Sequence, residues 1–270
     1  MSEIDFVEIG DCRLGYRSDG DGPALLFVHA GIADGRMWEP QVADFARSFR
    51  VIRPDLRGYG ETTKPTESFA HHEDLRRLLT HLGVRRAAVI GASMGGAAAI
   101  DLCLEHPQLV SALVLVCSAL GGCEFEDPWL DKEASAADAA FESGDRETAA
   151  RIEMETWLAG PKRSLDDVDQ EVVRRLAEML LRSYALHADA HERELSPPAA
   201  SRLGEIRVPT LVMVGAGDVV DTHRIADLLA RGIKGTRKIV VKSTAHLPSM
   251  ERSTEFNRLV EEFLRDVVGV

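Results

Sequence analysis

Ser93 is the residue whose surroundings most clearly indicate chemistry. It lies in the segment VIGASMGGAAAI (89–100), where Gly91 to Gly95 fit the pattern G-x-S-x-G between an apolar run and a predicted helix. A serine in such a strand-turn-helix segment adopts a strained backbone, so its neighbours must be small. Its hydroxyl then stands clear of the backbone, at a helix N-terminus that favours developing negative charge. The alternative is an ordinary serine N-cap before a helix that packs through small residues.

A nucleophilic serine needs a general base, and the base needs an acid that holds its tautomer. Downstream of Ser93, Asp218 ends the apolar run LVMVGAGD, and His246 follows the run IVVKSTA. The 27 residues between them hold one predicted helix and one predicted strand, which return the chain to the same sheet edge. We therefore predict a triad of Ser93, Asp218 and His246. Asp221 is the rival acid, but it precedes IADLLA and is typical of a helix N-cap.

The other histidines fit the role of the base less well. Most lie in or beside predicted helices, and His29 ends a predicted strand but comes before the serine. His187 and His191 are four residues apart and could share one helix face as metal ligands. We identify no third ligand for them in the sequence, so we expect neither a metal nor another cofactor.

The tetrahedral intermediate of acyl transfer needs two hydrogen-bond donors for its oxyanion. One is predicted to be the backbone amide of Met94, the residue after the nucleophile. The other should come from the loop HAGI (29–32) after the first long apolar strand. Gly31 is the favoured donor because a residue without Cβ lets its N–H approach the substrate, and Ile32 stays open as the alternative.

Short apolar runs alternate with amphipathic helical segments along most of the chain. The runs at 24–30, 49–55, 87–93, 111–118, 209–218 and 236–246 are predicted to be buried strands. Helices are predicted between and after them, as in HEDLRRLLTHLG and EFNRLVEEFLRDVV. This alternation predicts an α/β fold, a mostly parallel sheet with helices on both faces. The first two short runs, DFVEIGD and CRLGYRS, are expected to form an antiparallel hairpin at the sheet edge.

The alternation stops between the runs at 111–118 and 209–218. Some ninety residues there favour helices only, with breaks at Pro128, Gly144, Gly160 and Pro197. A structureless loop of that length is uncommon in a compact domain. We predict a core formed by residues 1–118 and 209–270, with a helical cap insertion at 119–208 over the strand ends.

Composition excludes several classes of partner. The 270 residues are 45% hydrophobic and 28% charged, and the net charge of −12 argues against a nucleic-acid partner, which needs a basic face. Residues 121–200 hold 19 Asp and Glu against 9 Lys and Arg, an excess that we expect mainly to aid solubility. The sequence contains no apolar run of membrane-spanning length and no signal-peptide pattern, so we expect a cytoplasmic protein without a membrane partner. The four cysteines follow no metal or redox spacing and are expected to be small, reduced core residues.

The motifs FVHAGI (27–32), DLRGYG (55–60), GASMGG (91–96), VGAGD (214–218) and AHLPSMER (245–252) together resemble the α/β-hydrolase fold family. The combination is most similar to the branch of 3-oxoadipate enol-lactonases, small carboxylesterases and cofactor-free haloperoxidases. Two departures are visible. His29-Ala30 stands where the family usually has His-Gly, and Leu247 follows the histidine where carbon–carbon bond hydrolases typically carry tryptophan.

The resemblance implies a serine hydrolase that cleaves a small ester or lactone through an acyl-enzyme intermediate. Carbon–carbon bond hydrolysis or acyl transfer by the same triad is the alternative, and a non-catalytic receptor for a small ligand is another. Trp129 and Trp157, in the otherwise acidic cap, are candidates for the roof of the substrate pocket, and the alternative is that they form the cap's own core and its seam with the main domain. We expect a neutral, fairly apolar substrate, unless a buried arginine such as Arg182 binds a carboxylate.

Overall fold

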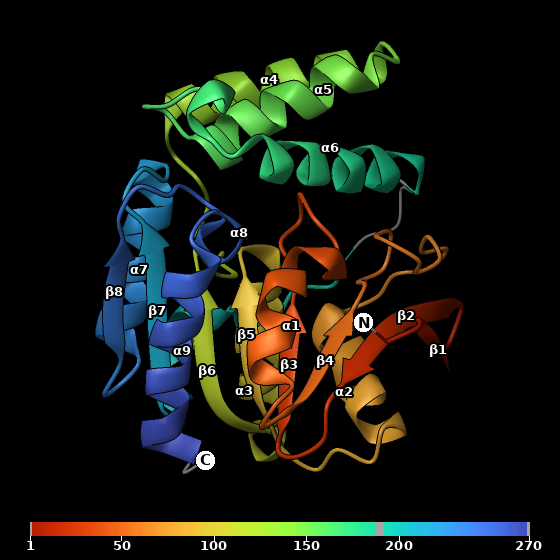
Figure 1. Ribbon diagram of the computed structural model, residues 1–270, viewed down its shortest axis with the longest axis vertical. Coiled ribbons are helices and arrows are strands. Elements are labelled where there is room, and N and C mark those ends of the chain that lie inside the picture. Colours follow the sequence, from red (N-terminus) through yellow and green to blue (C-terminus); the bar gives the residue numbers. More distant parts are fainter. Residues whose placement is uncertain (1, 187–191, 269–270) are drawn as a thin grey trace.

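The computed structural model describes residues 2–186 and 192–268, and within these ranges eight strands form one sheet (Figure 1). The strands are Asp5–Ile9 (β1), Cys12–Asp19 (β2), Ala24–Val28 (β3), Arg50–Pro54 (β4), Ala87–Ala92 (β5), Val110–Val116 (β6), Thr210–Gly215 (β7) and Arg237–Val241 (β8). Their order across the sheet is β1-β2-β4-β3-β5-β6-β7-β8. The pairs β1–β2 and β2–β4 are antiparallel, and the other pairs are parallel.

The predicted strands are confirmed, including the antiparallel hairpin at the N-terminal edge. The expectation of full burial is wrong for β8. Val240 is 47% exposed, and of this strand only Val241 is buried. An edge strand pairs with only one neighbouring strand and stays partly exposed to solvent. A run of β-branched residues in such a strand therefore does not require burial.

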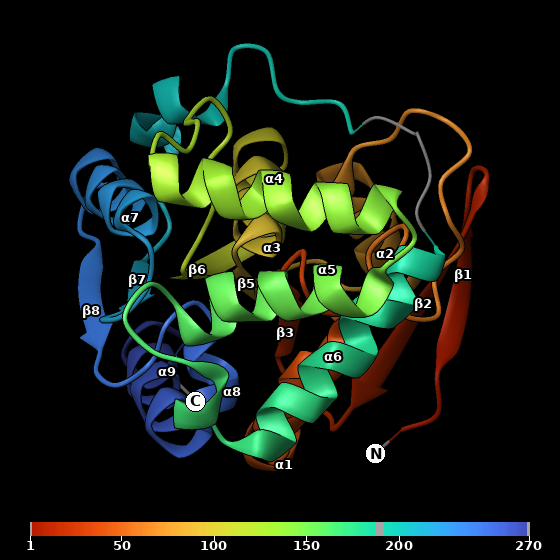
Figure 2. The same ribbon diagram turned by 90° about the horizontal axis from the view of Figure 1, so that it is seen from above.

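Helices cover both faces of the sheet, as predicted (Figure 2). They are Glu39–Phe45 (α1), His71–His81 (α2), Met94–Glu105 (α3), Val220–Gly232 (α7), Pro248–Glu251 (α8) and Ser253–Val268 (α9). One side carries α1, α8 and α9, and the other carries α2, α3 and α7. On the first side, Trp38 stacks between Phe27 of β3 and Phe256 of α9, with ring centroids 5.1 and 6.1 Å away. These aromatic contacts attach the helices to the strand that precedes the 29–32 loop.

A layer of helices lies over the carboxyl ends of the strands (Figure 1). It contains Pro128–Glu142 (α4), Arg146–Glu153 (α5), the π-helix Met154–Ala159 and Gln170–Ala185 (α6), all from the stretch between β6 and β7. The predicted breaks fall at its element ends: Pro128 begins α4, and Gly160, with φ of 75°, ends the π-helix. The division into a core and a cap at 118/119 and 208/209 stays a prediction. Of the helices described, none is long and apolar enough to cross a membrane.

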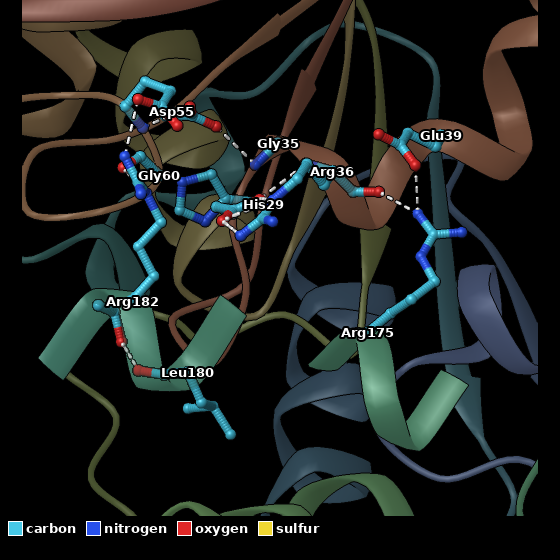
Figure 3. Close-up of polar contacts among 12 residues, drawn as sticks. His29, Gly35, Arg36, Glu39, Asp55, Gly60, Arg175, Leu180 and Arg182 are labelled. Atoms are coloured by element: carbon cyan, nitrogen blue, oxygen red, sulfur yellow. Dashed lines mark hydrogen bonds and ion pairs between the residues drawn. The ribbon is translucent and has the colours of Figure 1, made fainter. Parts of the chain in front are cut away.

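Two arginines of α6 attach this layer to the core (Figure 3). Arg175 donates to the Arg36 carbonyl oxygen at 2.9 Å and pairs with Glu39 at 2.6 Å. Arg182 donates to the Gly60 carbonyl oxygen and pairs with Glu61 at 2.7 Å, and its side chain is 42% exposed. The expectation that Arg182 is a buried arginine available to a substrate carboxylate is therefore wrong, because its guanidinium is half-exposed and engaged with the core.

Helix α3 approaches the sheet more closely than side chains with a Cβ would permit. A Cβ at Gly95 would lie 2.4 Å from the Val28 carbonyl oxygen, and one at Gly96 would lie 2.2 Å from Ser118 Oγ. Ala98 and Ala99, one turn further on, are also buried. The small-residue sequence GGAAA thus sets the distance between α3 and the strands beneath it.

We expect Gly95→Ala to lower the free energy of unfolding by about 1–3 kcal/mol, because the added methyl group would push α3 away from β3. Gly204→Ala is the matched control, since nothing lies within 4 Å of the position that its Cβ would take. The control should stay within about 0.5 kcal/mol of the wild type. Urea-induced unfolding measures both, and equal loss in the two variants would contradict the close approach of α3.

Candidate active site

Ser93 stands at the junction of β5 and α3 in a backbone conformation that L-residues rarely adopt. Its φ of 51° and ψ of −117° lie outside the usual helix and strand regions. The amide of Ser93 donates to the Val116 carbonyl oxygen at 2.9 Å, and its carbonyl oxygen accepts from the Ala119 amide at 3.0 Å. A Cβ at Gly91 would lie 2.3 Å from the Gly95 carbonyl oxygen, so the turn also requires glycine there. Packing and hydrogen bonds therefore hold the strain in place.

The N-cap alternative does not account for this serine. An N-cap residue usually has an extended backbone, and its side chain accepts a hydrogen bond from the first turn of the helix. Ser93 has a positive φ, and its side chain makes no capping hydrogen bond to α3. The strand-turn-helix geometry predicted from the sequence is therefore present, with the hydroxyl free of the helix backbone.

Asp218 and His246 form a buried hydrogen-bonded pair beyond the ends of β7 and β8. Asp218 Oδ2 lies 2.8 Å from His246 Nδ1, and the two side chains are 1% and 2% exposed. The other carboxylate oxygen of Asp218 accepts from the Val219 amide at 2.8 Å. A carboxylate only accepts hydrogen bonds, so Nδ1 carries the proton and Nε2 is left as the basic nitrogen. The pair can therefore take up a proton at Nε2.

The rival acid Asp221 has a different structural role. It lies in the first turn of α7, where its carboxylate accepts from the Glu126 and Asp127 amides at 2.7 and 2.8 Å. The same carboxylate pairs with Arg224 at 2.9 Å. The expectation that Asp221 caps this helix is wrong, because the N-cap residue is Val219. Asp221 instead anchors the segment that leads into α4.

The cap supports the loop that carries His246. The His246 amide donates to the Trp157 carbonyl oxygen at 3.1 Å, and the two rings lie 4.6 Å apart. Trp157 belongs to the π-helix, a distortion that frequently occurs at functional sites. A Cβ at Gly160 would lie 2.4 Å from the Gly217 carbonyl oxygen, so the cap also contacts the loop before Asp218.

A second tie to this loop runs through Glu251, which sequence reasoning did not single out. Glu251 Oε1 accepts from the Ala245 amide at 2.9 Å, and Arg163 of the cap pairs with Glu251 Oε2 at 2.7 Å. These two charged residues lie 88 positions apart in the chain, and no local pattern relates them. The backbone of the residue before His246 is thereby held from both the core and the cap.

His29 orders the loop in which the second oxyanion donor was predicted. Its ring is fully buried, with Nδ1 2.9 Å from the Ala30 carbonyl oxygen and Nε2 2.9 Å from the Leu56 amide. The carbonyl can only accept and the amide can only donate, so Nδ1 carries the proton and the ring is neutral. Burial lowers the pKa of His29 and keeps it neutral. His29 therefore joins the 29–32 loop to the loop after β4.

Of the candidate oxyanion donors, Met94 follows Ser93 in the chain, and Gly31 lies close to the Met94 side chain. Met94 is the first residue of α3, so its amide has no carbonyl partner within the helix. Neither the Gly31 nor the Ile32 amide donates a hydrogen bond to any other residue in the described part of the chain. A Cβ at Gly31 would make only ordinary contacts, at 3.6 Å or more, so the turn itself does not require glycine there. Both loop residues remain candidates for the second donor.

Two cavities adjoin at Met94 and Glu192. The Ser93 cavity, of about 370 Å³, is lined by Ser93 together with Leu120, Leu195 and Ala199 among others. The Tyr59 cavity, of about 320 Å³, lies between the core and α6 and is lined by Gly31, Tyr59, Leu180 and Tyr184 among others. Each volume suits a small ligand. A substrate centred on Ser93 can therefore extend in two directions.

The two cap tryptophans occupy different places. Trp157 packs against His246 and lies 5.9 Å from the ring of Phe125. Trp129 lies in the first turn of α4, where its amide donates to Asp127. Neither is among the described residues that line the two cavities. Their predicted role in substrate binding stays a prediction, and Trp157 has the contact that makes it the stronger candidate.

Cys117 completes the surroundings of the acid and the base. Atoms of Cys117, Asp218 and His246 that could bind a metal lie within 4.8 Å of one another. A metal-binding cysteine is a thiolate, whereas burial and the charge of Asp218 raise the pKa of the Cys117 thiol well above its usual range. Asp218 and His246 are also hydrogen-bonded to each other, so the group fits an acid–base pair better than a metal centre.

The other metal-binding candidates of the sequence, His187 and His191, lie outside the described residues. All four cysteines are free, as expected.

Known proteins resemble this chain along most of its length. Est816, described as an N-acyl homoserine lactone degrading enzyme, is 30% identical, with a TM-score of 0.78 over 96% of this chain and 100% of its own. A 3-oxoadipate enol-lactonase of Acinetobacter baylyi is 24% identical over 99% of this chain and 100% of its own. A 2-hydroxy-6-oxo-6-phenylhexa-2,4-dienoate hydrolase of Comamonas testosteroni is 25% identical over 98% of this chain and 96% of its own.

A more similar relative matches over a shorter stretch. An uncharacterized protein of Mycobacterium tuberculosis is 37% identical over 117 residues, which make up 42% of this chain and 34% of that protein. This chain thus matches about a third of that relative's length. A sequence profile of the alpha/beta hydrolase fold matches residues 23–253. With the mostly parallel sheet covered by helices on both faces, these matches confirm the resemblance seen in the motifs: the chain belongs to the α/β-hydrolase fold family.

Proposed function

We propose that this protein is a serine hydrolase that cleaves a small, fairly apolar carboxylic ester or lactone through an acyl-enzyme intermediate. The observation that carries the proposal is the strained turn that places Ser93 at a cavity. The buried Asp218–His246 pair follows two other strands at the same edge of the sheet. Relatives named as lactonases and as a lactone degrading enzyme support ester or lactone chemistry.

In the proposed mechanism, Ser93 Oγ attacks the carbonyl carbon while His246 Nε2 accepts the hydroxyl proton. Asp218 holds the Nδ1 tautomer and stabilises the imidazolium that forms. The amides of Met94 and of Gly31 or Ile32 donate to the oxyanion. His246 then protonates the leaving alcohol, and in the second half it activates the water that releases the acyl group.

Three alternatives use the same site. Carbon–carbon bond hydrolysis is favoured by the similarity to the dienoate hydrolase, and acyl transfer would need only an alcohol or amine in place of water. A non-catalytic ligand-binding role would leave Ser93 unreactive. A fluorophosphonate probe separates this last case, because it labels an activated serine and spares an unactivated one.

We expect Ser93→Ala to lower kcat/KM for p-nitrophenyl esters by about a thousandfold or more, because the nucleophile is lost. Fluorophosphonate labelling should be lost with it. The matched control is Ser135→Ala, which changes an exposed serine of α4 and should stay within about twofold of the wild type. Near-wild-type turnover by a folded Ser93→Ala protein would refute the mechanism.

The two candidate acids should behave differently on substitution. We expect Asp218→Asn to lower kcat by about a hundredfold to ten-thousandfold, since the amide no longer fixes the His246 tautomer. Asp221→Asn should lower kcat less than about tenfold and act mainly on stability, because it weakens the anchor of α4. Steady-state kinetics and thermal unfolding of both variants give the comparison. The reverse ranking in kcat would identify Asp221 as the acid.

Removal of metal ions should not change the activity. Every charge that the proposed mechanism needs is supplied by side chains and backbone amides of the chain. Dialysis against excess EDTA, followed by an ester hydrolysis assay, tests this expectation. A loss of activity that added zinc restores would show that the Cys117, Asp218 and His246 group works as a metal site instead.

A further inference from the structure

Carboxyl groups dominate the charged lining of the Ser93 cavity. Asp101, Glu124, Glu192 and Glu194 line it, and of the described lining residues none is a lysine or arginine. Arg202 lies near Asp101 but is paired with Glu105 at 2.6 Å and with Glu205 at 3.0 Å. This cavity therefore presents negative charge to whatever group extends from Ser93 into it.

The described residues that line the Tyr59 cavity also provide no available cation. Arg57 is the one lysine or arginine among its described lining residues, and its side chain is 5% exposed. Arg57 pairs with Asp74 at 2.6 Å and with Asp11 at 2.5 Å. Two carboxylates thus neutralise one guanidinium and take up its donors. Glu153, whose pKa is raised by burial, lines the same cavity.

His71 lines the Tyr59 cavity and has one buried ring nitrogen without a partner among the described residues. The residue is 3% exposed, and the nitrogen concerned is Nδ1. Burial, with smaller contributions from His29 and Arg57, lowers the pKa of His71 to about 3, so the ring is neutral. Its Nε2 faces Glu192 Oε2 at 3.8 Å, which favours a proton on Nε2. Nδ1 is then an acceptor without a donor, and such a buried atom needs a partner.

Glu192 and Asp101 both line the Ser93 cavity, and the charge of Asp101 acts on Glu192. Burial raises the pKa of Asp101 to about 6, and one of its carboxylate oxygens is buried without a partner. Glu192 is only partly buried, and this partial burial together with the charge of Asp101 raises its pKa to about 7. Above these values both groups are ionised and repel each other, and a donor or cation between them would relieve the repulsion.

We propose that the part of the substrate that extends from Ser93 into the cavities carries a hydrogen-bond donor, above all an amine. Substrates with a carboxylate in that part are rejected. This inference rests on the proposed ester or lactone hydrolysis at Ser93 and names its substrate class. An ammonium or N–H group meets carboxylates in both cavities: Asp101, Glu192 and Glu194 in the Ser93 cavity, and Glu153 and Glu192 in the Tyr59 cavity. A carboxylate meets like charge and finds no available cation among the described lining residues.

Three esters of matched length test the proposal. They are the p-nitrophenyl esters of heptanoic acid, 6-aminohexanoic acid and adipic acid, which end in a methyl, an ammonium and a carboxylate group. At about pH 8, where the cavity carboxyl groups are ionised, we expect kcat/KM for the adipate ester to be at least about tenfold below that for the heptanoate ester. The aminohexanoate ester should equal or exceed the heptanoate ester. Rates with Ser93→Ala give the uncatalysed background.

Neutral variants of the cavity carboxylates locate the effect. Glu192→Gln and Asp101→Asn should each lower the ratio of kcat/KM for the aminohexanoate ester to that for the adipate ester by about fivefold. Glu142→Gln, which removes one charge from an exposed end of α4, is the matched control and should leave the ratio within about twofold. Glu192 is 41% exposed, so its replacement should not prevent folding.

The outcomes separate this proposal from the proposed function. Hydrolysis of the adipate ester at least as fast as the heptanoate ester would overturn the charge selection and leave the serine mechanism standing. The charge selection would also be overturned if neither Glu192→Gln nor Asp101→Asn changed the ratio of kcat/KM for the aminohexanoate ester to that for the adipate ester. If no ester is hydrolysed above the Ser93→Ala background, ester hydrolysis itself fails and the substrate class fails with it.

Discussion

The turn at Ser93 depends on one steric constraint, the near-contact between the backbone of α3 and the strands beneath it. Gly91 lies against the carbonyl of Gly95, and Gly95 lies against the carbonyl of Val28, each at a distance that a Cβ could not occupy. Where α3 lies this close to the strands, Ser93 adopts a backbone φ of 51°, and its hydroxyl makes no capping hydrogen bond to the helix. The strain costs stability, and the packing of neighbouring residues maintains it. The position of Ser93, the proposed nucleophile, is therefore a property of the whole strand-helix unit.

The base depends on a second set of contacts, which join the cap to the core. The His246 amide bonds to the Trp157 carbonyl, and Arg163 and Glu251 hold the residue before it. On the other side of the cap, Arg175 and Arg182 of α6 bind the segments that follow β3 and β4 (Figure 3). The cap thus has two roles: α6 lines the Tyr59 cavity, and the π-helix contacts the proposed base. Changes in the cap should affect both binding and proton transfer.

The distribution of charge has a role beyond solubility. The excess of acidic residues in 121–200 is expected mainly to aid solubility, and four of these residues, Glu124, Glu153, Glu192 and Glu194, also line the cavities. The only guanidinium in the described lining is bound by two aspartates. In a partly enclosed site, uncompensated carboxylates influence ligands more strongly than the same groups do in water. The cavities thus favour a donor group and disfavour an anion.

Local sequence patterns were enough to predict the fold and to select the candidate reactive side chains. Apolar runs of β-branched residues specify strands, and the glycines around Ser93 specify the turn. The partners of His29, Glu251 and Arg57, and the true role of Asp221, were decided by the tertiary structure alone. Their partners come from distant parts of the chain, as with Arg163 and Glu251, and burial keeps the His29 ring neutral. Pairing across such separations arises only when the chain folds, since no local sequence pattern encodes which side chains will share a cavity.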